Sequence, residues 1–468
     1  MVRGKGNMKS ILAIAGLAVK TSVRSKLVIS LSVILLMVVL GLPFSIKGDG
    51  TLNGQTALLI YYSLAFSSII LGIATLWVSC WTISREVEEK YIQMLVVKPV
   101  RRSYIWIGKW LGIAFLNGVL LIAAGAVTYI AVQLKVSDKG ADADEVQVTL
   151  NEVLVSRLSM EPDREDVSDE AHKLMHELVK RGVIPKETSH VEAYEQAYKQ
   201  VMAKRAVVRP GSSKEWRFDI SDIGAQSEAW LRYHLSMSAR ERNPVSGEWV
   251  IGTDKNPDAL RVSIDNYLFG RHMLEVPSES LDGAAELTVK FINADREKSN
   301  IAYFDIEDDL ELLVESGSFT GNYIRSLVIL FCQLAVLAAM GLTAGSLLTF
   351  PVASFSVASL LAIAMLSHYF TISYDSASGH QHHECEDHGH SHEYRAKTVL
   401  LDAMEGVVLN AHIIVKPAMK YRTLSNLSSG NINSPKTTLE AVLILLLLYP
   451  GLLGLVGAWF LNKREMAL

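Results

Sequence analysis

The sequence predicts a polytopic all-α membrane domain with six transmembrane helices, together with an extracytoplasmic β-rich domain of sandwich or jelly-roll type that has a helical preface. Half of the 468 residues are hydrophobic and 20% are charged, whereas soluble chains carry about 25% charged residues. The hydrophobic residues are concentrated in runs near the roughly 20 residues that a membrane-crossing helix needs. One polar stretch of about 190 residues divides these runs into two groups, which predicts the second domain.

Charge and cysteine content exclude several classes of protein. The net charge of -4 leaves no cationic surplus to neutralise phosphates, so a strongly basic nucleic-acid binder is excluded. Of the three cysteines, Cys80 and Cys332 lie inside apolar runs, which argues against a disulfide scaffold. The chain has no Gly-x-x-x-x-Gly-Lys-Ser/Thr motif, so it predicts no nucleotide site of its own. No arrangement of nucleophile and base supports a membrane enzyme.

The six expected spans follow the apolar runs in order. They are residues 27–46, residues 57–83, residues 104–134, two helices within residues 327–370, and residues 439–461. The fourth run is too long for one span, and Phe350-Pro351 near its middle offers a break, because proline lacks a backbone donor and restricts the preceding residue. We therefore expect two helices joined by a tight hairpin.

Basic residues near the ends of the spans predict the orientation. The segment before the first span and the loop after the second are both rich in lysine and arginine, so both are expected in the cytoplasm. With six spans, both termini are then expected in the cytoplasm. The expected location of the protein is a bacterial inner (plasma) membrane. Residues 11–26 suit a helix lying at the inner interface. A signal peptide is the competing interpretation, but no small-x-small cleavage pattern follows Ile46.

Three parts of the chain follow from this pattern. Residues 1–134 hold the interfacial helix and the first three spans. Residues 135–325 form the soluble domain, helical at first and then built from six runs of alternating polarity typical of strands. Residues 326–468 hold the last three spans and a His-rich extracytoplasmic loop at 371–436, in which residues 399–415 suggest a re-entrant or interfacial helix.

Three tryptophans in the alternating runs could stack on carbohydrate or fill a core. Trp216, Trp230 and Trp249 each lie within a predicted strand. Tryptophan is highly buried on average, so we expect these side chains to belong to the core of the soluble domain.

The loop after the second span is the most specific segment. Residues 83–102 begin with Ile-Ser-Arg-Glu-Val-Glu-Glu and end with Val-Lys-Pro-Val-Arg-Arg, and Gly108-Lys109-Trp110 follows. An acidic start and a terminating proline predict a short charged amphipathic helix that could dock on a partner. A basic anchor loop that only holds the topology is the alternative. The candidate coupling residues are Arg85, Glu86, Glu88, Glu89, Leu95, Lys98, Pro99 and Arg101.

These motifs resemble the coupling-helix region of type-2 ATP-binding-cassette (ABC) transporter permeases, and the interfacial N-terminal helix and six-span count are similar as well. The resemblance implies that the coupling residues sit in a groove of a separate ABC ATPase subunit, which binds ATP and Mg. It also implies a homodimer, or a heterodimer with a paralogous permease. The expected function is that of the permease subunit of an ATP-driven exporter whose substrate the sequence does not identify. Many relatives carry their large outer domain after the first span, whereas this chain carries it after the third.

A second unusual segment holds six of the thirteen histidines. Its candidate metal ligands are His380, His382, His383, Cys385, His388, His390 and His392. Imidazole and thiol groups are the ligands that Zn²⁺ and Cu²⁺ favour. Three interpretations stay open: a loop that collects metal without consequence, a metal-sensing or delivery role, and a pH-responsive patch. The alternative function is thus a membrane-anchored extracytoplasmic receptor or a protein that senses or handles Zn or Cu.

Overall fold

The computed structural model describes most of the chain, in two compact units. The described residues are 2–46, 50–88, 101–137, 142–163, 166–185, 188, 190–221, 223, 228–236, 245–253, 256, 260–267, 270–277, 281, 284–294, 301–304, 310–375 and 420–463. The membrane unit comprises the described residues of Met1–Ser156, Gly317–Tyr369 and His388–Leu468. The β-rich unit comprises those of Arg157–Ser316 and Phe370–Asp387.

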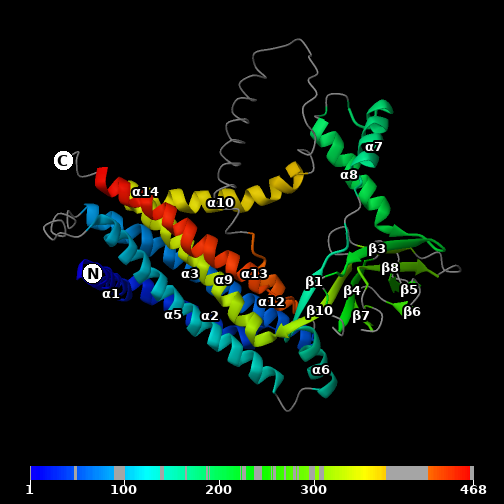
Figure 1. Ribbon diagram of the computed structural model, residues 1–468, viewed down its shortest axis with the longest axis horizontal. Helices are drawn as coiled ribbons and strands as arrows, with labels where there is room; N and C mark the ends of the chain where they lie inside the picture. Colours follow the sequence, from blue (N-terminus) through cyan, green and yellow to red (C-terminus); the bar gives the residue numbers. More distant parts are fainter. Residues whose placement is uncertain are drawn as a thin grey trace, which may run out of the picture. The chain divides into compact units, whose positions relative to one another are not determined.

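Long apolar helices build the membrane unit (Figure 1). They are α1 (Val2–Val23), α2 (Lys26–Ser45), α3 (Leu52–Glu88), α5 (Arg102–Val136), α9 (Phe319–Leu347) and α10 (Phe350–Asp375), followed by the short α12 (Thr423–Ser428) and a last helix formed by α13 (Pro435–Ala441), the π-helical η2 (Val442–Leu448) and α14 (Tyr449–Lys463). Within the described residues, five helices are long and apolar enough to cross a membrane: α2, α3, α5, α9 and the last helix. The apolar part of α10, Phe350–Ile363, is shorter than these, so a sixth span stays a prediction.

The long apolar run divides close to the predicted break. Helix α9 ends at Leu347 and α10 begins at Phe350, so the chain turns at Leu348 and Thr349, just before the expected Phe350-Pro351. Leu348 has extended backbone angles, φ -119° and ψ 164°. Pro351 lies in the first turn of α10, where its missing N–H costs no intrahelical bond. Proline therefore starts the second helix and does not itself form the turn.

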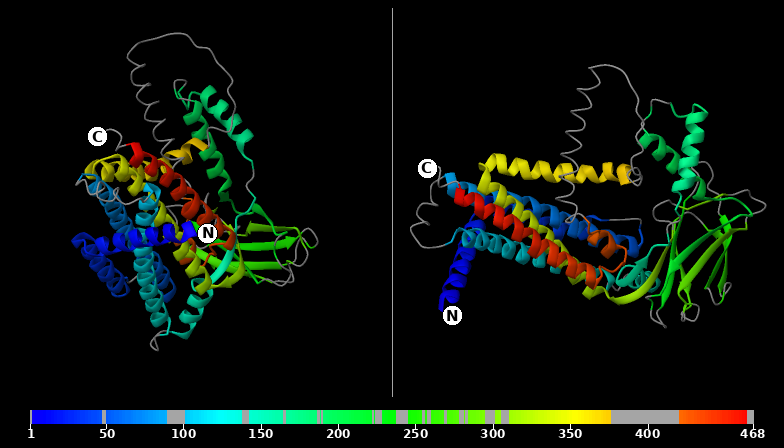
Figure 2. Two further views of the ribbon diagram at one scale, coloured as in Figure 1. Left: turned by 60° about the vertical axis from the view of Figure 1, so that its left-hand side comes forward. Right: turned by 45° about the horizontal axis from the view of Figure 1, so that its top comes forward.

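Helix α1 crosses the bundle helices at a steep angle, as Figure 2 shows. Two glycines of α5 allow the close approach. A β-carbon at Gly108 would lie 2.8 Å from the β-carbon of Ile14, and one at Gly112 would lie 2.7 Å from the carbonyl oxygen of Ala15 and 2.9 Å from the β-carbon of Ala18. No larger residue fits against a backbone oxygen at that distance without moving the helix. Docking of α1 therefore depends on these two glycines.

A buried cluster of amides fixes the approach to the last helix. The Asn433 side chain donates to Ser326 Oγ over 2.8 Å and to the Thr423 carbonyl over 3.2 Å, and its backbone N–H donates to Asn322 Oδ1 over 2.8 Å. Asn322 in turn donates to the Asn431 carbonyl over 2.8 Å. Paired amides of this kind avoid the cost of leaving buried polar groups unsatisfied. They tie the segment before α13 to α9.

The β-rich unit consists of two antiparallel sheets (Figure 1). Its strands are β1 (Val155–Met160), β2 (Val207–Val208), β3 (Ser213–Asp219), β4 (Ala229–Ser236), β5 (Val245–Thr253), β6 (Leu260–Tyr267), β7 (Gly270–Val276), β8 (Glu286–Asn293), β9 (Ala302–Phe304) and β10 (Leu310–Ser318). One sheet has the order β1-β10-β4-β9-β2, with β7 also paired to β4, and the other has the order β3-β8-β5-β6. All six runs that alternate in the sequence form strands.

Side chains from both sheets form one core. Trp216 of β3 and Trp249 of β5 are buried in it, beside Phe291 and Phe304, so the expectation of core tryptophans is confirmed for these two. Trp230 differs, because it is only partly buried and the Arg157 guanidinium lies over its ring at 3.8 Å. Alternation places Trp230 on the face of β4 opposite to the core residues Leu231 and Tyr233. Two packed sheets with a shared core are a β-sandwich.

The helices predicted ahead of the strands fall in both units. Helices α7 (Ser168–Lys180) and α8 (His190–Arg205) pack on each other in the β-rich unit around their own small core. Helix α6 (Ala143–Glu152) lies in the membrane unit, where it packs on the start of α3. There Glu152 accepts a hydrogen bond from Asn53. The helices of the predicted helical preface are therefore divided between the two units.

The glycine contact between α1 and α5 predicts the effect of a larger side chain. Gly112→Leu should separate α1 from α5 and expose Ala18, which is 4% accessible. With Cys385 replaced by serine, a cysteine introduced at Ala18 should react several-fold faster with a thiol reagent in the Gly112→Leu variant. Gly118→Ala on the same helix is the control, because its nearest neighbour is the movable Phe331 ring at 3.3 Å. Equal reaction rates in both variants would show that α1 does not depend on Gly112.

Candidate functional site

The predicted coupling residues bracket a segment of which the structure describes the two ends. Arg85 and Glu86 lie in the last turns of α3, where Glu88 is the final residue, and Arg101 is the N-cap of α5. Glu89, Leu95, Lys98 and Pro99 fall in residues 89–100, outside the described part of the chain, so the expected amphipathic helix is untested. We call residues 87–101 the coupling segment.

A buried lysine joins the two helices that flank the coupling segment. Lys109 Nζ of α5 lies 2.7 Å from Glu86 Oε2 of α3, and it donates a hydrogen bond to the Thr82 carbonyl over 3.0 Å. The Lys109 side chain is 5% exposed and that of Glu86 is 28% exposed. An ammonium removed from water needs a counter-charge and acceptors, and α3 supplies both. The ends of α3 and α5 are thus held together at the base of the coupling segment.

The upstream end of the segment is also fixed to α9. Ser84 Oγ donates to the Gly345 carbonyl at 3.1 Å, with the Leu348 carbonyl at 3.2 Å, near the C-terminus of α9. One turn earlier, Gly341 faces Ser79, so closely that a β-carbon there would overlap the serine side chain. The Arg85 guanidinium lies over the Trp81 ring at 4.9 Å. The end of α3 that leads into the coupling segment is therefore packed closely on α9.

The downstream end of the segment contacts the last helix. Arg102 Nη1 donates to the Leu461 carbonyl over 2.6 Å, close to the C-terminus of α14, where a cation complements the helix dipole. The buried Trp106 ring packs on Gly454 and Gly457 of α14, which leave space for it. Trp110 Nε1 donates to the Ala335 carbonyl of α9 over 2.9 Å. The first three turns of α5 are thus attached to both α14 and α9.

The sequence predicts the residues of the loop, whereas the structure adds partners on distant helices. In the sequence, Lys109 stands out only as part of Gly108-Lys109-Trp110. Its position inside an apolar span was the available signal, since an intramembrane charge is costly and is usually paired. Nothing in the local sequence indicates that Arg102 reaches Leu461, because that contact joins residues far apart in the chain.

The candidate metal ligands, His380 to His392, also lie outside the described residues. Within the described part of the chain, no group of three or more His, Cys, Asp or Glu side chains is placed to hold a metal ion. The metal-binding role predicted for the His-rich tract is therefore untested. Of the three cysteines, Cys80 and Cys332 are buried and free.

Five long apolar helices with a paired intramembrane charge define an integral membrane protein. Residues 12–158 match the model of the family described as ABC-2 family transporter protein. The matched residues run from α1 through α2, α3, α5 and α6 into β1, and so include the coupling segment. The match confirms the resemblance to ABC-2 type permeases seen in the sequence, over this part of the chain. No curated protein and no solved structure matches the chain.

The unequal exposure of the ion-paired side chains predicts unequal effects of removing them. Glu86→Gln leaves the ammonium of Lys109 buried without a counter-charge, so the variant should lose roughly 3 kcal/mol of stability. Lys109→Met leaves a carboxylate that water can reach, and should cost only about 1 kcal/mol. The double variant should be more stable than Glu86→Gln alone. Thermal unfolding of the purified protein in one detergent measures all three.

The exposed pair Lys199 and Glu195 on α8 is the matched control. The same two substitutions there should each change stability by less than about 1 kcal/mol, because the lysine is 72% exposed. If Glu86→Gln is as mild as Glu195→Gln, the pair at the base of the coupling segment does not hold the two helices together.

Proposed function

We propose that the chain is the permease subunit of an ATP-driven ABC exporter, and that the coupling segment docks on a separate ABC ATPase subunit. The family match covers this segment and supports a permease component. ATP and Mg would be bound by the partner. The permease would act as a homodimer, or as a heterodimer with a paralogous permease, and its substrate is not identified.

The observation that carries the proposal is the attachment of both ends of the segment to the bundle. Ser84 contacts α9, Lys109 joins α5 to α3, and Arg102 contacts α14. A displacement applied to the segment would therefore reach four membrane helices at once. Rigid packed helices move as bodies and do not deform continuously. Such an arrangement suits the conversion of ATPase closure into helix movement.

Within this proposal the acidic residues have different roles. The Glu86 carboxylate contacts Lys109 inside the chain, so Glu86 would position the base of the segment. Glu88, the final residue of α3, and Glu89 would face the ATPase.

The alternative function, a membrane-anchored receptor or a protein that handles Zn or Cu, rests on the His-rich tract. No described residue favours it over transport, and it stays a prediction from composition.

Charge reversal in the coupling segment should separate the two subunits. Glu89→Lys places a cation where the proposed groove accepts a carboxylate, and should reduce co-purification of the ATPase at least tenfold. The effect should be measured with the full-length chain expressed beside its candidate ATPase.

The matched control is Glu315→Lys, a reversal at an exposed position of the β-rich unit. It should leave the complex intact. A Glu89→Lys protein that still binds the ATPase and stimulates ATP hydrolysis normally would refute the docking role of the segment.

We propose further that α10 completes six spans, that both termini are cytoplasmic, and that the β-rich unit lies outside the inner membrane. The basic residues around α1 and the coupling segment support this orientation through the positive-inside rule. In order along the chain, the first five of the six predicted spans correspond to α2, α3, α5, α9 and α10.

Single cysteines test this topology in whole cells whose outer membrane has been permeabilised. With Cys385 replaced by serine, a cysteine at Glu315 should react with a membrane-impermeant maleimide, because the β-rich unit would face the outside. A cysteine at Lys463, at the end of α14, should react only after the inner membrane is opened. The reverse pattern would invert the topology, and reaction of both sites in intact spheroplasts would exclude the odd number of spans proposed between the β-rich unit and the C-terminus.

A further inference from the structure

The residues of helix α1 form three lines along its surface, and the first of these lines docks on α5. It contains Ile11, Ala15, Ala18 and Ser22, of which the first three contact the glycines of α5 described above. Ala18 is 4% exposed and Ser22 is 2% exposed. Positions that differ by four, seven or eleven residues lie on one side of an α-helix. We call this side the docking line.

An apolar line lies next to the docking line. Met8, Leu12 and Val23 are 65%, 62% and 49% exposed, and the half-buried Val19 lies on the same side. Leu12, Val19 and Val23 each come one residue after a member of the docking line, which turns the apolar line about 100° around the helix. Exposed apolar side chains of this kind are favoured in contact with hydrocarbon.

A line of cations lies about 100° further around the helix. Lys9, Lys20 and Arg24 each come one residue after a member of the apolar line, and all three are exposed. The first acidic residue of the chain is Asp49, so neither α1 nor α2 supplies a carboxylate to balance them. The cation line therefore needs negative charge from outside these two helices.

The contacts with α5 fix the direction in which the apolar line points. Helix α1 crosses the bundle helices at a steep angle (Figure 2), so it lies along the membrane plane and not across it. Ile14 lies against Gly108, whereas Ala15 lies against Gly112, one turn further into the span. Ala15 is on the side of the docking line nearer to the apolar line, and Ile14 is on the other side. The apolar line therefore faces the interior of the membrane.

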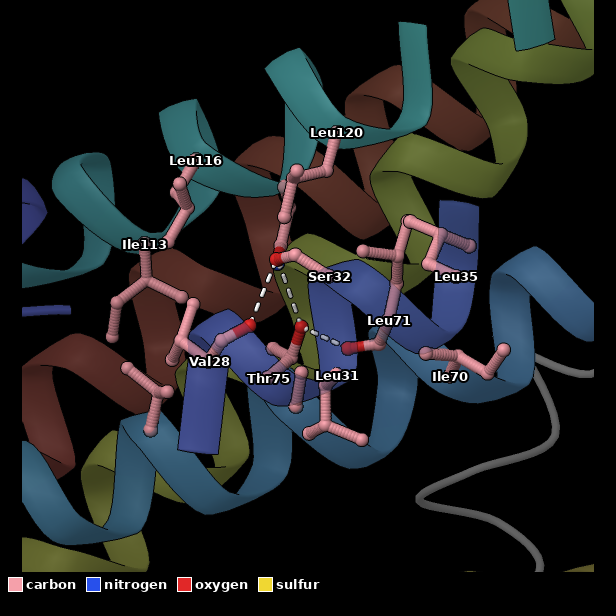
Figure 3. Close-up of a pocket in the computed structure, with 13 residues that line it drawn as sticks. Val28, Leu31, Ser32, Leu35, Ile70, Leu71, Thr75, Ile113, Leu116 and Leu120 are labelled. Atoms are coloured by element: carbon pink, nitrogen blue, oxygen red, sulfur yellow. Dashed lines mark hydrogen bonds between the residues drawn. The ribbon is translucent and has the colours of Figure 1, made fainter. Parts of the chain in front are cut away.

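The link to α2 holds α1 in this rotation. Only Arg24 and Ser25 separate α1 from α2, and Val28 in the first turn of α2 packs with Ile113 of α5 in one buried cluster. Both side chains line a small, largely apolar crevice between α2, α3 and α5 (Figure 3). Contacts of both helices with α5 thus keep the cation line turned away from the bundle.

We propose that the cation line of α1 binds the anionic phospholipid headgroups of the leaflet in which the helix lies, with the apolar line in the hydrocarbon beneath them. The cation line is turned about 200° from the docking line, where long basic side chains reach the level of the headgroups. Negatively charged headgroups attract basic residues near the membrane surface. The inference does not depend on the proposed transport function. It makes the packing of α1 on Gly108 and Gly112 sensitive to lipid composition.

Quenching by brominated lipids measures the direction of the apolar line in the full-length protein. With Cys385 replaced by serine, a bimane label is attached to a cysteine at Leu12 or at Leu17, which are 62% and 57% exposed. Leu17 comes one residue before Ala18 and so lies on the other side of the docking line. In nanodiscs of phosphatidylcholine brominated in its acyl chains, the label at position 12 should be quenched at least about threefold more than the label at position 17. Equal quenching, or the reverse order, would overturn the proposal.

The label at position 12 also measures the lipid preference of the cation line. Brominated phosphatidylglycerol or brominated phosphatidylcholine is added at the same mole fraction to ordinary phosphatidylcholine. The anionic lipid should quench the label at least about twofold more than the neutral lipid, because the cations enrich it locally. This excess should disappear when Lys9, Lys20 and Arg24 are all changed to glutamine, and it should shrink at high salt concentration.

Three exposed lysines of the β-rich unit provide the matched control. Glutamine at Lys173, Lys180 and Lys204 removes the same charge from the other unit and should leave the excess unchanged. The comparison of the two lipids with the cation line intact does not require the triple variant to fold. Equal quenching by both lipids in that protein, or an excess that survives the triple substitution, would overturn the proposal. A triple variant that keeps the lipid excess but no longer co-purifies with the ATPase would show that the cation line faces that protein, which also contradicts headgroup binding.

Discussion

The membrane unit depends on one electrostatic constraint: the ammonium of Lys109 is buried near the end of the bundle and must be neutralised there. Among the described side chains, Glu86 supplies the neutralising carboxylate, at 2.7 Å. Because Glu86 is in the last turns of α3 and Lys109 is in the second turn of α5, satisfying the charge fixes the ends of both helices. It also fixes where the coupling segment leaves and re-enters the bundle. A lysine with a less buried position would allow these ends to separate.

Close packing by small residues extends this constraint to the other helices. Gly108 and Gly112 admit α1 to one face of α5, while Gly454 and Gly457 admit Trp106 to the last helix. Backbones that approach this closely gain dispersion contacts, which are the main source of helix association where no hydrophobic effect operates between helices in lipid. The first three turns of α5 therefore contact α1, α3, α9 and α14. This makes α5 the element through which movement of the coupling segment would spread.

The sequence predicted features that depend on local pattern. The spans follow from the length of the apolar runs, and the strands of the sandwich follow from alternation, as the confirmed positions of Trp216 and Trp249 illustrate. Strand β9, of three residues, is too short for such a pattern, and β7 is not marked by regular alternation. Trp230 lies in an alternating run like the other two tryptophans, but its side chain is on the face of its strand that points away from the core. The sequence alone does not show which face of a strand packs on the second sheet, so this difference could not be predicted. Contacts between distant segments, such as Arg102 with Leu461 and α6 with α3, leave no local signal at all.

The central claim is that the coupling segment and the last helix are mechanically linked through Arg102. A spin label at Lys463, at the end of α14, measures this link directly in the complex with the ATPase. Binding of ATP should change the spectrum of the label in the wild-type protein, and Arg102→Leu should abolish most of that change while the complex stays intact. An ATP-dependent change of equal size in the Arg102→Leu protein would show that α14 moves by another route and would contradict the account.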